Sequence, residues 1–201
     1  MSSLVLTGDT SGQVSLAAAA VAGSNTITVQ AATGTMSVNT LATVNAGGTN
    51  PFPSSGGPTA VDFSNLPAWV KKITVMFSGV SLSATANFLL QVGTGGTPTS
   101  TGYASSSIGV ATAGAPAVTS TSGYIFYAAG AAGTFSGIIT IANITGNTWV
   151  ANGVLAQTTG TAVNTIGGGS VALGGVMNIL RITTTSTDTF DAGSVNILYE
   201  G

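Results

Sequence analysis

The acid–base chemistry open to this chain depends on five carboxylates, because the sequence contains no histidine and no cysteine. Without those residue types the chain cannot form a disulfide, a cysteine nucleophile, a histidine base or a zinc site of the usual kind. Asp188 and Asp191 lie three residues apart in the stretch STDTFDAGS. Cleavage of a glycosidic bond requires two carboxylates about 5 to 10 Å apart. The pair therefore indicates one candidate activity, hydrolysis of a carbohydrate.

A structural role for Asp188 and Asp191 is the competing interpretation, and the one we favour. The stretch is a polar loop between two strand-like segments, where Asp side chains accept hydrogen bonds from nearby backbone amides. Glycines also cluster at 167–169 and 174–175, but a phosphate-binding loop needs a following helix and usually a lysine. Neither is visible in the sequence, so these glycines predict bulges or turns. We expect no enzymatic activity, no cofactor and no metal.

Two adjacent lysines, Lys71 and Lys72, begin the strand-like segment KKITVMFSG. Neighbouring residues of a strand point to opposite faces, so the two lysines cannot form one basic patch. Lys71 shares its face with Ile73, Val75 and Phe77, which we predict to be the core face, and therefore belongs at the rim of that face. These lysines are expected to serve the structure.

The three basic and five acidic residues of the chain are the available partners for structural ion pairs. The candidate residues are Lys71, Lys72, Arg181, Asp62, Asp188 and Asp191. We predict a contact between a lysine or arginine and an aspartate that joins the start of the lysine-bearing strand to the DTFDAG loop.

Aromatic side chains among polar residues are the candidates for surface recognition, because a sugar stacks its apolar faces on aromatic rings and bonds to amides and hydroxyls. The candidates are Tyr103, Tyr124, Tyr127, Asn147, Trp149 and Asn152. The competing interpretation is core packing, which we favour for Trp149. Tyr103 is expected to be exposed, because small polar residues surround it.

The composition excludes several classes of partner. Charged residues make up 4% of the chain and its net charge is −2, so there is no basic patch for nucleic acid or for an anionic membrane surface. No apolar run approaches the ~18 residues of a membrane-spanning helix, so we expect no membrane insertion. The first residues have no basic segment before an apolar core, so no signal peptide is predicted. So little charge protects the surface weakly against self-association, and we expect an oligomer or larger assembly.

The elements that must position these residues are β-strands. Short runs rich in Val, Ile, Thr and Phe alternate with Gly, Ser and Asn, which predicts an all-β fold, either a sandwich or a barrel. Strands are predicted at 3–7, 12–17, 25–30, 35–44, 70–78, 86–92, 123–128, 134–142, 148–156, 170–183 with a break at the glycines, and 193–199. Residues 1–44 are a small β-rich module, 45–59 a Gly, Pro and Ser linker, and 60–201 the main domain. Residues 93–122 are predicted to form a long surface loop.

Two segments resemble proteins of tailed-bacteriophage virions. Residues 8–36, with AVAG and AATGT, resemble an N-terminal attachment module. The ordered set VDFSNLPAWVKKITVMFSGVS, FLLQVG, GNTW, NILRITT and DTFDAGSVNILYE resembles the C-terminal domain of phage tail-fibre and head-fibre proteins. The resemblance selects the sandwich, since it implies an antiparallel β-sandwich, a jelly-roll-like knob, and a homotrimer. It also implies attachment to capsid, tail or fibre proteins through the N-terminal module.

Two hypotheses for function follow from the resemblance. One is a short trimeric fibre or receptor-binding protein whose distal loops contact a host surface glycan or protein. The other is a capsid decoration or head-fibre protein anchored to the shell by its N-terminal module. Both place the protein in the virion. A third hypothesis, a threonine-rich ice-binding surface, requires a fixed repeat that the sequence lacks.

Overall fold

The computed structural model describes residues 52–111, 114–128, 130–131, 133–160 and 162–201, and three further strands at 3–7, 13–17 and 39–41. All secondary-structure elements among the described residues are β-strands. The chain divides into two compact units, Met1–Met36 and Ser37–Gly201. In the first unit, β1 (Ser3–Thr7) pairs antiparallel with β2 (Gln13–Ala17). The predicted strand at 25–30 lies outside the described residues.

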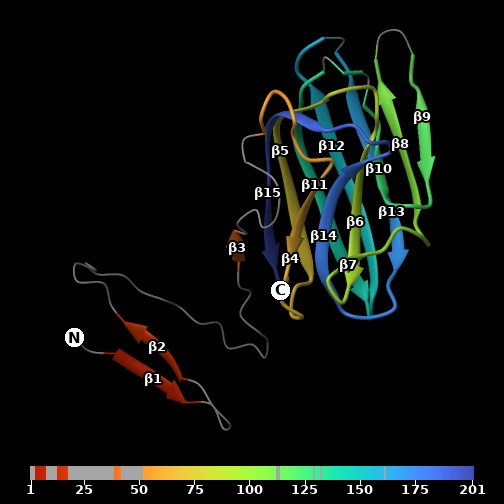
Figure 1. The fold of residues 1–201 in the computed structure, drawn as a ribbon. Helices are drawn as coiled ribbons and strands as arrows, with labels where there is room; N and C mark the ends of the chain where they lie inside the picture. Colours follow the sequence, from red (N-terminus) through yellow and green to blue (C-terminus); the bar gives the residue numbers. More distant parts are fainter. Residues whose placement is uncertain are drawn as a thin grey trace. The chain divides into compact units, whose positions relative to one another are not determined.

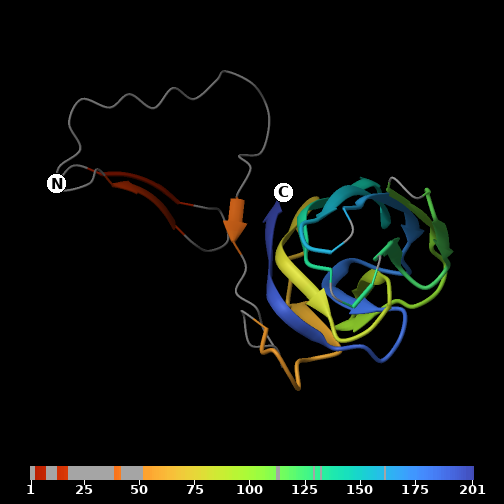
Figure 2. The same cartoon turned by 90° about the horizontal axis from the view of Figure 1, so that it is seen from above.

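The second unit is an antiparallel β-sandwich, as predicted (Figure 1). One sheet has the order β10 (Tyr124–Phe126), β6 (Phe88–Thr94), β14 (Met177–Thr184) and β4 (Ala60–Ser64), with β7 (Thr97–Pro98) also paired to β6. The other has the order β3 (Asn39–Leu41), β15 (Phe190–Glu200), β5 (Lys72–Leu82), β11 (Phe135–Thr145), β12 (Thr148–Gln157), β13 (Asn164–Ala172), β8 (Ala104–Val110) and β9 (Ala117–Ser120). Figure 2 shows the two sheets facing each other around a common interior.

The core between the sheets is built around Phe88, the first residue of β6. Its ring meets Phe77 and Phe135 edge to face, with centroids 5.4 and 5.3 Å apart, and lies 6.4 Å from Phe190. Phe190 in turn stacks on Phe52 at 5.0 Å. One aromatic cluster thus joins the segment before β4 to β5, β6, β11 and β15. Its edge-to-face contacts stabilise the core beyond the burial of apolar area.

The alternation in β5 follows the prediction. Ile73, Val75 and Phe77 are buried, whereas Lys72 on the opposite face is exposed. The predicted break near the glycines is also present, between the end of β13 and the start of β14. The sequence did not reveal β4, nor did it reveal the first half of β13.

Residues 93–122 are not the predicted surface loop. They contain the end of β6, then β7, β8 and β9, and β8 occupies a place between β13 and β9 in the larger sheet. The prediction failed because β8 reverses the usual pattern. Its buried positions carry Ser105 and Ser107, whereas Ile108 and Val110 face outward with 36% and 47% exposure.

Serine hydroxyls hold the edge strand β10 to the opposite sheet. The backbone N–H groups of Ile125 and Tyr127 donate to Ser105 Oγ at 2.9 Å and Ser107 Oγ at 3.0 Å. The Thr165 hydroxyl donates to the Tyr127 carbonyl at 2.8 Å. The two serines and Thr165 thus form the hydrogen bonds that a neighbouring strand would otherwise form with the free edge of β10 and the residue after it. The serines of β8 are therefore a structural requirement of this edge.

Glycine allows the two sheets to approach closely at the same place. A Cβ on Gly167 would lie 2.9 Å from the Ile125 carbonyl oxygen and 3.1 Å from Phe126 Cδ1. A Cβ on Gly109 would lie 2.4 Å from Tyr127 Cδ1. All three distances are shorter than ordinary contacts in a packed interior, so at both positions only glycine fits without a shift of its neighbours.

The predicted ion pair to the DTFDAG loop is wrong. Lys72 Nζ lies 2.9 Å from the Glu200 carboxylate, and Arg181 bonds Asp62 through two nitrogens at 2.7 and 2.6 Å. Strand register decides both pairs, because Lys72 is directly opposite Glu200 and Arg181 directly opposite Asp62. The contact between Arg181 and Asp62 thus joins β14 to β4.

The remaining charged candidates have other roles. Asp191 lies in β15 and accepts a hydrogen bond from the Ser81 hydroxyl of β5. The Asp188 backbone N–H donates to Ser186 Oγ at 3.0 Å within the loop. Lys71 is exposed, and its backbone N–H donates to the Glu200 carbonyl at 2.7 Å. No described carboxylate forms an ion pair with Lys71.

Candidate functional site

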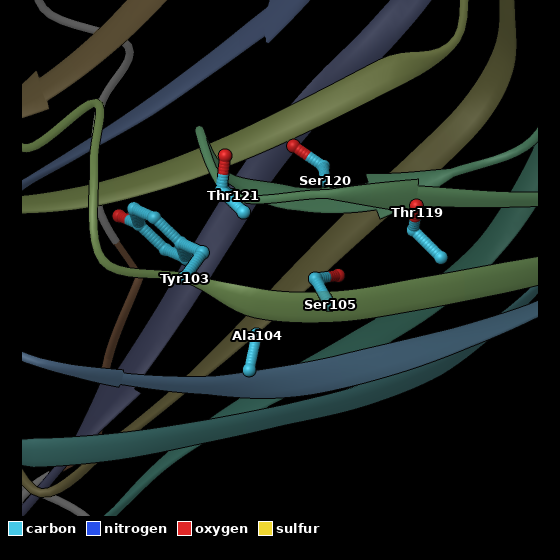
Figure 3. A pocket seen from close by; sticks show the side chains of 6 residues that line it. All are labelled: Tyr103, Ala104, Ser105, Thr119, Ser120 and Thr121. Carbon is cyan, nitrogen blue, oxygen red and sulfur yellow. The ribbon is translucent and has the colours of Figure 1, made fainter.

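A hollow of about 390 Å³ lies beside the start of β8 and the end of β9 (Figure 3). Its lining residues are Tyr103, Ala104, Ser105, Thr119, Ser120 and Thr121. Figure 3 shows Thr119 and Ser120 of β9, and Thr121 just after it, across from Tyr103 and Ser105. The lining is uncharged and rich in hydroxyls.

Most of the hydroxyls in this hollow already have partners in the protein. The Tyr103 hydroxyl accepts from Val92 N at 2.8 Å and donates to Val92 O at 3.1 Å. Ser105 Oγ donates to the Gly168 carbonyl at 2.9 Å as well as accepting from β10, and Ser120 Oγ accepts from Ser122 N at 3.0 Å.

Thr119 and Thr121 differ from the other hydroxyl residues of the hollow. Both are exposed, and neither side chain has a hydrogen bond within the described part of the chain. They leave only two hydroxyls for a ligand, too few to define a specific pocket.

The prediction that Tyr103 is exposed is wrong. The side chain is 3% exposed, because it crosses from the start of β8 to the backbone of β6 in the opposite sheet. Its ring meets Tyr124 edge to face at 5.0 Å, and the Tyr124 hydroxyl donates to the Trp149 carbonyl at 3.0 Å. Burial raises the pKa of both tyrosines, so both remain neutral hydrogen-bond donors at physiological pH.

Core packing of Trp149 is confirmed, since its side chain is 3% exposed. Trp149 lies on the inner face of β12 and Asn152 on the outer face, so the two cannot form one binding site. Asn147 lies in the turn between β11 and β12, where its carbonyl accepts from Leu173 N at 3.0 Å. Tyr127 is half-buried after β10. The structure therefore does not gather the predicted aromatic and amide residues into one surface.

The described carboxylates are spread over the sandwich. Asp191 and Glu200 lie at opposite ends of β15, and Asp62 lies in the other sheet beside Arg181. The side-chain hydrogen bond from Arg181 to Asp62 is the main reason that the pKa of Arg181 is raised. Among the described residues, no group of three or more metal-ligating side chains is present.

A further surface feature lies on the outer face of the eight-stranded sheet. Ile138 of β11 is directly opposite Met76 of β5 and Val154 of β12, Val154 is opposite Ile166 of β13, and Ile166 is opposite Ile108 of β8. We call these five residues the apolar row. Sequence reasoning missed it because the register that aligns five strands cannot be read from any one of them.

Comparison with protein-family models, curated proteins and solved structures returned no match to this chain. Among the described residues no helix is long and apolar enough to cross a membrane. Inferences about function therefore depend on the fold, the surface and the sequence.

Proposed function

We propose that this chain is a structural protein of a bacteriophage virion, a short trimeric fibre or receptor-binding protein. In this proposal its N-terminal module attaches it to capsid, tail or other fibre proteins. The loops at the far end of its sandwich contact a glycan or protein of the host surface. Its mechanism is binding without catalysis, and three identical copies raise the apparent affinity by avidity.

The observation that supports the proposal most is where the fibre-like motifs lie. FLLQVG lies in β6, NILRITT in β14 and VDFS in β4, and these strands are neighbours in the smaller sheet. The motifs that contain β5 and β15 are neighbours in the larger sheet. Segments far apart in the sequence thus form two contiguous parts of one sandwich, as a shared domain would require.

The far-end loops are the candidate host-contacting surface. We define them by their described residues, which lie at the opposite end of the sandwich from the start of β3 (Figure 1): 83–87, 111, 114–116, 127–128, 130–131, 133–134, 158–160, 162–163 and 185–189. Among their described residues, Thr134 Oγ1 lies 2.8 Å from Thr158 Oγ1 and 3.0 Å from Thr159 Oγ1. The Thr158 hydroxyl also donates to the Thr134 carbonyl, so this cluster offers a sugar hydroxyl the acceptor capacity that its internal bonds leave.

The test is to label intact particles with antibodies raised against this chain and locate the label by electron microscopy. Label at the tail or its fibres, together with reduced particle adsorption when the full-length chain is added to cells, is the expected result. Particles that carry no label would contradict a virion role. Label at the tail without an effect of saturating protein on adsorption would contradict the receptor-binding role alone.

A capsid decoration or head-fibre protein is the second candidate. It is favoured by the sequence, because residues 1–201 contain no repeat of the kind that builds a fibre shaft. A short projection therefore suits this chain better than a long fibre. Label confined to the head would decide for this candidate.

A further inference from the structure

We propose that the outer face of the eight-stranded sheet is the surface through which copies of this chain associate, with the apolar row at the centre of the contact. The inference rests on the proposed function only for the number of copies. Association through this face depends on the chain's own residues.

Exposure of the apolar row is the first argument. Ile138 is 54% exposed, Val154 and Ile166 are 49% exposed and Ile108 is 36% exposed. These residues are adjacent across four strands, so they form one patch rather than scattered apolar residues. Contiguous exposed apolar surface of this kind marks an interaction site.

The reversed pattern of β8 is the second argument. Its outward positions carry Ile108 and Val110, whereas Ser105 and Ser107 point inward. A strand whose outer face met only water would place polar residues there. The arrangement is stabilising if the outer face is covered by another molecule.

Charge narrows the choice of occupant to a second copy. Strands β8, β9, β11, β12 and β13 contain no charged residue. A nucleic acid, an anionic membrane or a charged peptide would find no counter-charge on the outer face of these five strands. The next row consists of Thr140, Asn152, Gly168 and Ser106, which offer neutral hydrogen-bonding groups beside the apolar row. An uncharged, partly apolar partner fits, and the same face of another protomer has that composition.

The area of the face is sufficient for a stable contact. Strands spaced ~4.8 Å apart and rising ~3.3 Å per residue give a six-strand face of about nine residues an area on the order of 850 Å². A standard protein–protein interface buries about 800 Å² on each partner. The outer face of β15, β5, β11, β12, β13 and β8 is therefore about the size of one side of a standard interface, with the exposed Lys72 at the start of β5.

The test is Val154→Lys in the full-length chain, with Val176→Lys as the matched control. Val176 is 56% exposed and lies between β13 and β14, outside both sheets. The molar mass is measured by sedimentation from about 1 nM to about 100 μM, because interfaces of standard size have dissociation constants from micromolar to picomolar. We expect wild type and Val176→Lys to be oligomers. Val154→Lys should associate at least ~100-fold more weakly, because its ammonium would be buried without a partner.

A monomeric wild-type chain over that range would overturn the inference and would mean that another molecule covers the face. A folded Val154→Lys chain with wild-type mass would overturn it as well. If circular dichroism shows Val154→Lys to be unfolded, Val154→Thr keeps the branched shape and decides by the same measurement. None of these results affects antibody labelling of particles, so failure of the inference is distinguishable from failure of the proposed function.

Discussion

The Ser107 hydroxyl accepts a hydrogen bond from the backbone N–H of Tyr127 at 3.0 Å and donates one to the Ile166 carbonyl at 3.0 Å. One side chain thus connects β8, β13 and the segment after β10. Ser107 is 4% exposed, so water cannot replace it in these bonds.

Removing this hydroxyl is expected to destabilise the sandwich. Ser107→Ala leaves the Tyr127 N–H without its acceptor, which costs about 1 to 3 kcal/mol. Ser106→Ala is the control, because Ser106 is the next residue of the same strand and its exposed side chain faces outward. Urea unfolding of both variants measures the difference. Equal stability of the two variants would show that the serine bonds contribute nothing.

A methyl group at position 167 is expected to separate the two sheets locally. Gly167→Ala places a Cβ 2.9 Å from the Ile125 carbonyl oxygen, and relief of that contact costs about 1 to 3 kcal/mol. Gly174→Ala is the control, since a Cβ there would meet no atom within 4 Å. Thermal unfolding compares the two. A Gly167→Ala chain as stable as the control would contradict the close approach of β13 to β10.

The buried hydroxyl of Tyr103 is expected to stabilise β6. Tyr103→Phe removes the acceptor of the Val92 N–H. The buried N–H is then left without a partner, which costs about 1 to 3 kcal/mol of unfolding free energy. Tyr127→Phe is the control, because Tyr127 is half-buried and its hydroxyl has no bond within the described residues. Chemical denaturation distinguishes the two variants. If both are as stable as wild type, the bond between Tyr103 and Val92 is not a stabilising one.

Stability is expected to fall in alkaline solution. Burial raises the pKa of Tyr103 and Tyr124 above the ordinary value of 10.0. The unfolded chain therefore loses these protons first, so their contribution is complete below about pH 10 and decreases as the pH rises further. Each phenol contributes about 1.4 kcal/mol per pH unit in that range.

The slope of unfolding free energy against pH above 10 measures this effect, and Tyr103→Phe should lower the slope by one proton. An unchanged slope in that variant would mean that Tyr103 ionises equally easily in the folded chain.

The sequence could predict the strands whose alternation follows the common rule. Ile73, Val75 and Phe77 identify the buried face of β5, and packing of Trp149 was also predictable from its type. The pairing of Lys72 with Glu200 was not, because cross-strand register between distant segments leaves no local trace.

The region around β8 shows why composition misled the prediction. Small polar residues with no large side chain indicate a loop, but here Ser105 and Ser107 are buried as acceptors for an edge strand. Tyr103 was expected to be exposed for the same reason. Its bond to Val92 depends on the distance between the two sheets, which only the assembled fold defines.

The strand order also determines when the sandwich can form during synthesis. β15 lies between β3 and β5 in the larger sheet, and β14 lies between β6 and β4 in the smaller one. Both sheets therefore remain incomplete until residues 177–200 have left the ribosome, and β4 must wait more than half the chain for the partner that brings Arg181 to Asp62. Such long-range pairing takes on the order of milliseconds to seconds, so each sheet closes only after β14 and β15 have been made and not strand by strand as the chain emerges.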